Sequence, residues 1–144
     1  MAKRISLHQQ ALVAVLAAGG RLRRQLGSVL EAEGLSASQY NVLRILRGAG
    51  EPLPIMTIRD RMMDPEPSIT RLVDRLEKKG LITRHRREDD RRCVECQLTK
   101  DGIALLASLD EPVDKADRHL MKRLTTAELG MLRQLSDKVG IRED

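Results

Sequence analysis

The side chains with the widest chemical repertoire in this sequence are two cysteines and three histidines. Cys93 and Cys96 could hold a metal ion, but a zinc site needs a second pair of cysteines or histidines, and the sequence has none at a suitable spacing. Along a strand, positions three apart point to opposite faces, which opposes a disulfide between these two cysteines. His8, His85 and His119 lack the spacing of four that places two ligands on one helix face. We therefore expect neither a metal nor a cofactor.

Motifs for catalysis are also missing from the sequence. It has no serine, histidine and aspartate in a catalytic order, no glycine-rich nucleotide loop and no paired-carboxylate motif. Asp89 and Asp90 are adjacent, but they lie among arginines in a charged turn, where salt bridges are the simpler role. We expect no enzymatic activity.

The charge balance favours a polyanionic partner. The 26 lysines and arginines outnumber the 21 aspartates and glutamates, so the formal net charge is +5. Ribosomal, membrane-surface and merely soluble proteins share such a balance, and charge alone decides little. Tyr40 is the sole aromatic residue, whereas proteins that bind single strands stack the bases on several rings. Double-stranded nucleic acid remains as the expected partner.

Length and hydropathy indicate one domain without a membrane segment. A chain of 144 residues is long enough for one core and short for two. No run approaches the roughly 20 apolar residues of a spanning helix, and the start, Met1 to Arg4, lacks the apolar stretch of a signal peptide. We expect a single domain over 1–144, a cytoplasmic location and no membrane partner.

Apolar spacing predicts a mainly helical chain with one β-hairpin. Ser36 and Gln39, like Thr125 and Glu128, have the spacing of a capping box at a helix start. Glycines at 34, 48 and 80 are expected to end helices, and those at 19 and 20 to bend the first one. Helices are predicted over about 6–33, 37–47, 55–63, 67–79, 101–120 and 126–139, and strands over 81–86 and 93–99, with 51–54 as a loop and 87–92 as an arginine-rich turn.

The fourth predicted helix carries a sharply divided surface. Its apolar stripe should be buried, its start should be capped by Asp64 or Glu66, and its remaining side chains should face outward. Three short helices followed by a hairpin are the plan of a winged helix-turn-helix, in which the last short helix enters the major groove of DNA and the hairpin, the wing, lies along the backbone or in the minor groove. The buried stripe consists of Ile69, Leu72, Val73 and Leu76.

At three places the sequence resembles the MarR (multiple antibiotic resistance regulator) family. The resemblance covers the whole chain and implies a homodimer held by 1–34 and 102–144, with 35–101 as the DNA-binding lobe. It further implies a transcriptional regulator that binds a pseudo-palindromic operator, often represses it, and is often released by small phenolic or other lipophilic ligands. The resembling segments are 67–82 (PSITRLVDRLEKKGLI), Asp90-Arg91-Arg92 with 98–102 (LTKDG), and Leu35-Ser36-x-x-Gln39-Tyr40-x-Val42-Leu43.

Several side chains are then expected to contact DNA. Hydroxyls at the start of the fourth helix suit phosphates or base edges, and arginines one turn apart can contact bases or phosphates. Arg92 matches the family's wing-tip arginine, which implies a minor-groove contact, and Asp90 matches the residue that braces the turn. Asp74 could pair with Arg92 or Arg71. The full set expected at DNA is Ser68, Thr70, Arg71, Arg75, Lys78, Arg86, Arg91 and Arg92.

Three further possibilities stay open. A winged fold can serve instead as a protein-interaction module with an acidic partner. Cys93 is expected on the outward face of its strand and could make the regulator thiol-responsive, whereas Cys96 is expected in the core. Surplus apolar faces on the terminal helices favour a homodimer. Methionines could line a pocket for a small-molecule effector or simply fill the core; they are Met56, Met62, Met63 and Met121.

Overall fold

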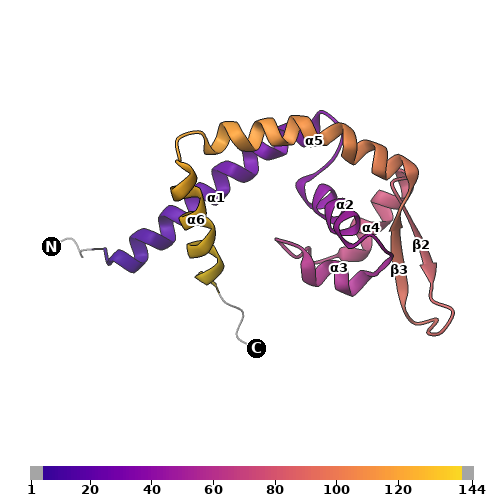
Figure 1. Cartoon of the computed structure of the whole chain (residues 1–144). Coiled ribbons are helices and arrows are strands. Elements are labelled where there is room, and N and C mark those ends of the chain that lie inside the picture. The colour runs from indigo at the N-terminus through magenta and orange to yellow at the C-terminus, as the bar shows by residue number, and fades with distance from the viewer. Residues whose placement is uncertain (1–4, 141–144) are drawn as a thin grey trace.

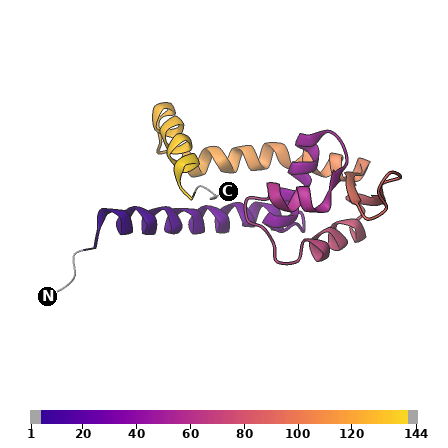
Figure 2. The same cartoon turned by 90° about the horizontal axis from the view of Figure 1, so that it is seen from below.

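Two long helices, α1 (Leu7–Glu31) and α5 (Lys100–Met121), lie side by side along the back of the molecule (Figures 1 and 2). This computed structural model describes residues 5–140, so Met1 to Arg4, on which the expectation about a signal peptide rested, lie outside the described residues. Helix α1 continues without interruption through the two glycines expected to bend it. No helix within residues 5–140 has both the length and the hydropathy to cross a membrane.

A lobe of three shorter helices packs at one end of this pair (Figure 1). They are α2 (Ala37–Ala49), α3 (Ile55–Arg61) and α4 (Ile69–Lys78). The capping box at Ser36 and Gln39 is present as predicted. The predicted end of α2 at Gly48 is wrong, because the helix continues to Ala49 and Gly50 adopts the left-handed conformation, with φ of 69°, in which a residue without a Cβ is favoured.

The predicted hairpin is present and belongs to a three-stranded antiparallel sheet. Strands β2 (Ile82–Arg86) and β3 (Val94–Leu98) form the wing, and β1 (Leu53–Pro54) pairs with the other side of β3. The prediction of a plain loop over 51–54 is therefore wrong in part. A two-residue strand has no periodicity to detect, and Pro54 is tolerated because β1 is an edge strand.

The start of α4 is not capped as predicted. Ser68 occupies the N-cap position without a side-chain capping bond. Asp64 instead pairs with Arg23 of α1 at 2.8 Å, and Glu66 accepts a hydrogen bond from the Ser38 hydroxyl of α2 at 2.6 Å. The two carboxylates therefore tie the segment before α4 to the neighbouring helices.

The core lies inside the lobe and under the adjoining part of α5. The parts of the long helices that are far from the lobe have exposed apolar side chains. Helix α6 (Thr126–Lys138) has its predicted capping box at Thr125 but no buried residue. It follows the end of α5 that lies away from the lobe (Figures 1 and 2). Exposed apolar side chains on α1 and after α5 include Leu12, Val15, Leu16, Leu129, Leu132, Leu135 and Val139. The mainly helical fold with a small β-wing confirms the predicted class.

Candidate nucleic-acid interface

Helix α4 presents a polar face away from the core. Ile69, Leu72, Val73 and Leu76 are buried as predicted, which fixes the rotation of the helix about its axis. The opposite surface carries the side chains expected at DNA. Thr70, Arg71, Arg75 and Lys78 are all exposed, and positions 71, 75 and 78 follow one another along one helical face because they are four and three residues apart.

The cations expected at DNA have no carboxylate partners within residues 5–140. None of the ion pairs in this part of the chain involves Arg71, Arg75, Lys78, Arg86, Arg91 or Arg92. Other arginines of the lobe are engaged, such as Arg47 with Asp110 at 2.9 Å. These six cations therefore have their full charge available for phosphates. Lysines and arginines neutralise phosphates when a protein binds DNA.

The wing tip is held by hydrogen bonds of its own. The Arg92 backbone N–H donates to the Asp90 carboxylate at 3.0 Å, and the Arg86 guanidinium donates to the Arg91 carbonyl at 3.0 Å. At the other side of the turn, Arg87 binds Asp89 through two hydrogen bonds, which raise the pKa of Arg87 and lower that of Asp89. These contacts leave the Arg92 side chain exposed at the end of the hairpin.

Asp74 has a different partner from the two that were expected. Asp74 pairs with Arg84 of β2, whose Nη1 lies 2.6 Å from the Asp74 carboxylate. The predicted pairing of Asp74 with Arg92 or Arg71 is therefore wrong. The expected partners lie on the exposed side of α4 and at the wing tip, whereas Arg84 sits where β2 packs on α4. Sequence reasoning missed Arg84 as a positioning residue, because β2 carries arginines at 84 and 86 that look equivalent in sequence.

A groove of about 450 Å3 runs between the start of α2 and α4. We call it the α2–α4 groove. The unbonded N-cap hydroxyl of Ser68 belongs to it, and so do the side chains of Arg71 and Arg75. Ser38 and Glu66 form its α2 end. The sequence indicated helix capping for Ser36 and no role for Ser38, and the place of both residues beside α4 emerges only in the fold.

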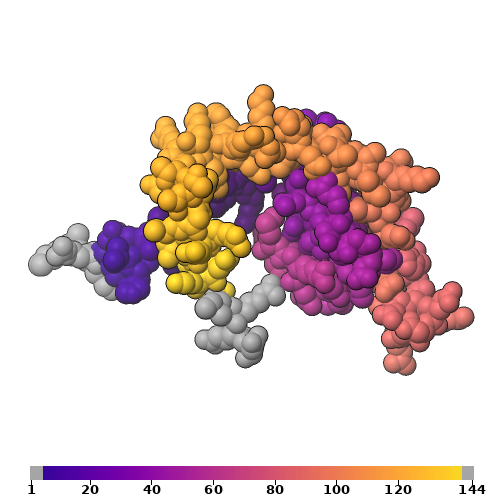
Figure 3. Space-filling view, viewed as in Figure 1, coloured from indigo at the N-terminus to yellow at the C-terminus, as the bar shows by residue number. Residues whose placement is uncertain are grey.

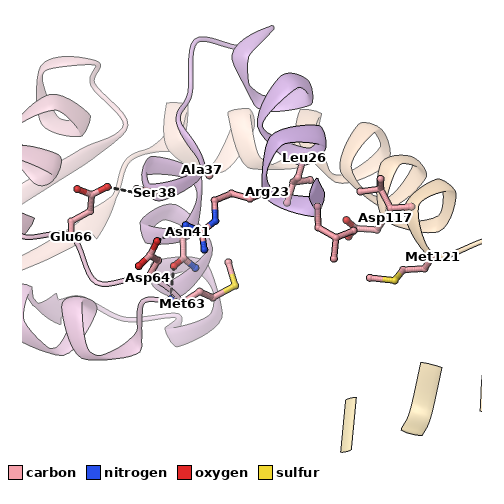
Figure 4. A pocket seen from close by; sticks show the side chains of 12 residues that line it. Arg23, Leu26, Ala37, Ser38, Asn41, Met63, Asp64, Glu66, Asp117 and Met121 are labelled. Atoms are coloured by element: carbon pink, nitrogen blue, oxygen red, sulfur yellow. Dashed lines mark hydrogen bonds and ion pairs between the residues drawn. The ribbon is translucent and has the colours of Figure 1, made fainter. Parts of the chain in front are cut away.

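A larger cavity, of about 750 Å3, lies between the α1–α5 pair and the lobe, beneath α5 (Figures 3 and 4). We call it the arm–lobe cavity. Two of the four methionines considered for a pocket, Met63 and Met121, line it, whereas Met62 is buried in the core and Met56 is exposed elsewhere. Its remaining walls are Leu22, Arg23, Leu26, Ala37, Ser38, Asn41, Asp64, Glu66, Asp117 and Leu120.

The cysteines and histidines are not assembled into a site. Cys96 is fully buried between strands, as predicted, and burial raises the pKa of its thiol to about 11. Cys93 is half-buried and also free. His85 lies 3.6 Å from the Glu95 carboxylate. Residues 5–140 contain no group of three histidine, cysteine or acidic side chains that could hold a metal ion.

Comparison with known proteins gives a consistent result. The model of the MarR family matches residues 35–94. The transcriptional regulator PecS of Dickeya dadantii is 33% identical over 118 residues, which cover 81% of this chain and 71% of PecS. The transcriptional repressor MprA of Escherichia coli is 26% identical over 142 residues, which cover 98% of this chain and 76% of MprA.

A solved structure extends the similarity to three dimensions. The crystal structure of a MarR mutant from E. coli complexed with operator DNA superposes with a TM-score of 0.82 and is 25% identical. The match covers 94% of this chain and 99% of that one. The helical frame and the wing are therefore shared with a protein that was crystallised on its operator.

Proposed function

This chain belongs to the MarR family of transcriptional regulators, and from that premise we propose that it is a cytoplasmic homodimeric repressor that binds a pseudo-palindromic operator. The observation that carries the proposal is the set of carboxylate-free cations on α4 and the wing, two elements that pack against each other. In this proposal the protein acts by binding and not by catalysis. The repressor named MprA among its relatives supports the direction of regulation.

Each protomer contacts one half-site through two elements. Helix α4 lies in the major groove, where Arg71 and Arg75 contact bases or phosphates and Thr70 and Ser68 contact phosphates near the helix start. The wing follows the backbone through Arg86 and Arg91, and Arg92 enters the minor groove. Lys78 adds a phosphate contact, and Asp90 keeps the wing tip in shape.

The dimer forms when a second copy of the chain packs on the exposed apolar faces of α1 and α6. Helix α6 has no buried residue although Leu132 and Leu135 are among its apolar side chains. Exposed apolar faces of this kind mark association surfaces, and a two-fold axis would place two α4 helices about 34 Å apart, one turn of DNA. The arm–lobe cavity is the proposed site of a small lipophilic or phenolic effector that releases the operator.

Selection of bound fragments from random duplex DNA at physiological salt tests this function. We expect one palindromic sequence to be enriched and its affinity to fall steeply with salt. Arg92→Ala and Arg75→Ala should each weaken binding by about 1–3 kcal/mol without unfolding the protein. Lys115→Ala removes an exposed cation on α5 and serves as the control.

Two results would overturn the proposal. If the protein is a stable monomer that binds no duplex, both the proposed dimer and the proposed DNA partner are wrong. Retention by any duplex at low salt, without preference for one sequence, would instead favour a winged-helix module with an acidic protein partner.

A further inference from the structure

We propose that the arm–lobe cavity takes an amphipathic cation whose charged head carries N–H donors, such as a primary amine or a guanidine on an apolar body. The inference rests on the proposed release of DNA by a ligand and names the chemical class of that ligand. Within the lipophilic or phenolic effectors of the proposed function, it selects lipophilic cations over anions such as carboxylates and phenolates. Charge, wall composition and connection to α4 each support it.

The charges around the cavity are unbalanced toward the negative. One guanidinium, that of Arg23, and three carboxylates, those of Asp64, Glu66 and Asp117, line the cavity. Figure 4 shows Arg23 beside Asp64, with Glu66 and Asp117 on opposite sides of this pair. Arg23 is already paired with Asp64 at 2.8 Å. Within residues 5–140, Glu66 accepts a hydrogen bond from the neutral Ser38 hydroxyl, and neither Glu66 nor Asp117 forms an ion pair. An anionic ligand would add to two uncompensated negative charges, whereas a monovalent cation would offset one of them.

The walls determine which kind of cation fits. Leucine and methionine side chains, among them Leu26, Leu120 and Met121, supply the apolar surface, which suits an alkyl or aryl body. No aromatic residue lines the cavity. Quaternary ammonium groups depend on aromatic faces and have no N–H to donate. A primary ammonium or a guanidinium instead forms charge-assisted hydrogen bonds with carboxylates.

The same carboxylates connect the cavity to the DNA-binding helix. Asp64 and Glu66 lie in the segment between α3 and α4, two to four residues before the N-cap Ser68. Ser38 and Glu66 line both the arm–lobe cavity and the α2–α4 groove, so their hydrogen bond separates the ligand from the DNA-facing surface. A cationic head that binds Glu66, or competes with Arg23 for Asp64, therefore acts directly on the start of α4. Such differential contact is what a ligand needs to shift an equilibrium.

Three probes with the same apolar body test the head group. Calorimetric titration of the full chain with n-octylamine, n-octanoate and octyltrimethylammonium compares a cation with N–H donors, an anion and a cation without donors. We expect octylamine to bind at least about tenfold more tightly than either of the others. Equal or tighter binding of octanoate, or no binding of any probe at millimolar concentration, overturns the inference.

A matched pair of variants assigns the preference to the cavity. Glu66→Gln should weaken octylamine binding by about fivefold or more and reduce the difference between octylamine and octanoate. Glu111→Gln removes one negative charge from an exposed position of α5 that does not line the cavity, and it should change neither. If the affinity for octylamine falls equally in both variants, the effect is due to net charge and the assignment to the cavity is wrong.

Operator binding is measured on the same samples. A failure of the proposed ligand class can then be distinguished from a failure of the proposed function. If the selected operator is bound but octylamine neither binds preferentially nor lowers operator affinity, the ligand class is wrong and the proposed function stands. If octylamine is preferred but no duplex is bound specifically, the proposed function fails and the cation site stands.

Discussion

Arg84 of β2 binds Glu77 of α4 through two side-chain hydrogen bonds, from Nε at 3.0 Å and from Nη2 at 2.7 Å to the same carboxylate oxygen. The backbone N–H of Arg84 donates to the other oxygen at 3.2 Å, and its Nη1 lies 2.6 Å from Asp74. One residue at the base of the wing therefore engages two carboxylates of α4. This arrangement fixes the direction in which the wing leaves the helix.

Replacing Arg84 should impair DNA binding although Arg84 is engaged with Asp74 and Glu77 and is not one of the proposed DNA contacts. We expect Arg84→Ala to weaken operator binding about tenfold because the wing loses its orientation, and to cost about 1 kcal/mol of stability, since the side chain is partly exposed. The variant removes no proposed phosphate contact, so the salt dependence of operator binding should change less than in Arg92→Ala. Fluorescence anisotropy with labelled operator measures both. The control is Arg118→Ala, which breaks a surface pair with Asp114 on α5; equal losses in the two variants would contradict the positioning role.

The Glu77 contact should make stability depend on pH in the acid range. The side-chain hydrogen bond from Arg84 lowers the pKa of Glu77 below its ordinary value of 4.5. As pH falls, the unfolded chain takes up the proton first, so the stabilisation is complete above about pH 5.5 and is lost as pH falls through the folded pKa. The free energy of unfolding of wild type should exceed that of Glu77→Gln by less than about 1 kcal/mol near pH 7, and the difference should shrink below pH 4.5. Urea titrations at several pH values measure it; a difference that stays constant to pH 3 would contradict the contact.

The two cysteines should differ in reactivity. Cys96 is fully buried and its pKa is raised to about 11 by burial, so at neutral pH it stays a protonated and inaccessible thiol. Cys93 is half-buried and directly precedes β3. A disulfide reagent should label one thiol per native chain and both after denaturation, and Cys93→Ser should abolish the native labelling. If the labelled protein binds operator like the unlabelled one, a thiol-responsive regulator is excluded.

Gly102 should not tolerate even one added methyl group. A Cβ at this position would lie 2.2 Å from the Leu81 carbonyl oxygen, and that oxygen is held by a hydrogen bond from the Thr99 backbone N–H at 3.1 Å. We expect Gly102→Ala to lower the free energy of unfolding by about 2–3 kcal/mol. Gly48→Ala in α2 meets no neighbouring atom and should raise it by up to about 1 kcal/mol. Thermal denaturation distinguishes the two, and a neutral Gly102→Ala would show that α5 can shift away from the wing.

Much of the fold could be predicted because its signals are local. Apolar stripes along α4 and the capping boxes at Ser36 and Thr125 depend on spacings of three and four residues, which one helix fixes by itself. The segment over 53–54 escaped prediction because it becomes a strand only where β3 offers an unpaired edge. The end of α2 was misplaced by two residues because Gly48 and Gly50 are equivalent in sequence, and only the backbone conformation selects one of them.

The sequence by itself determined the class of fold, the buried stripe of α4 and hence which arginines that helix turns outward, because burial of an apolar stripe fixes the rotation of a helix. Only the tertiary structure decided which charges meet. With 26 cationic and 21 acidic side chains in 144 residues, local spacing leaves very many pairings possible, and an ion pair forms where packing brings distant segments within reach. Arg84 therefore holds Asp74 and Glu77, and Arg23 holds Asp64. Two other carboxylates, those of Glu66 and Asp117, lie beside a cavity that no single segment encodes.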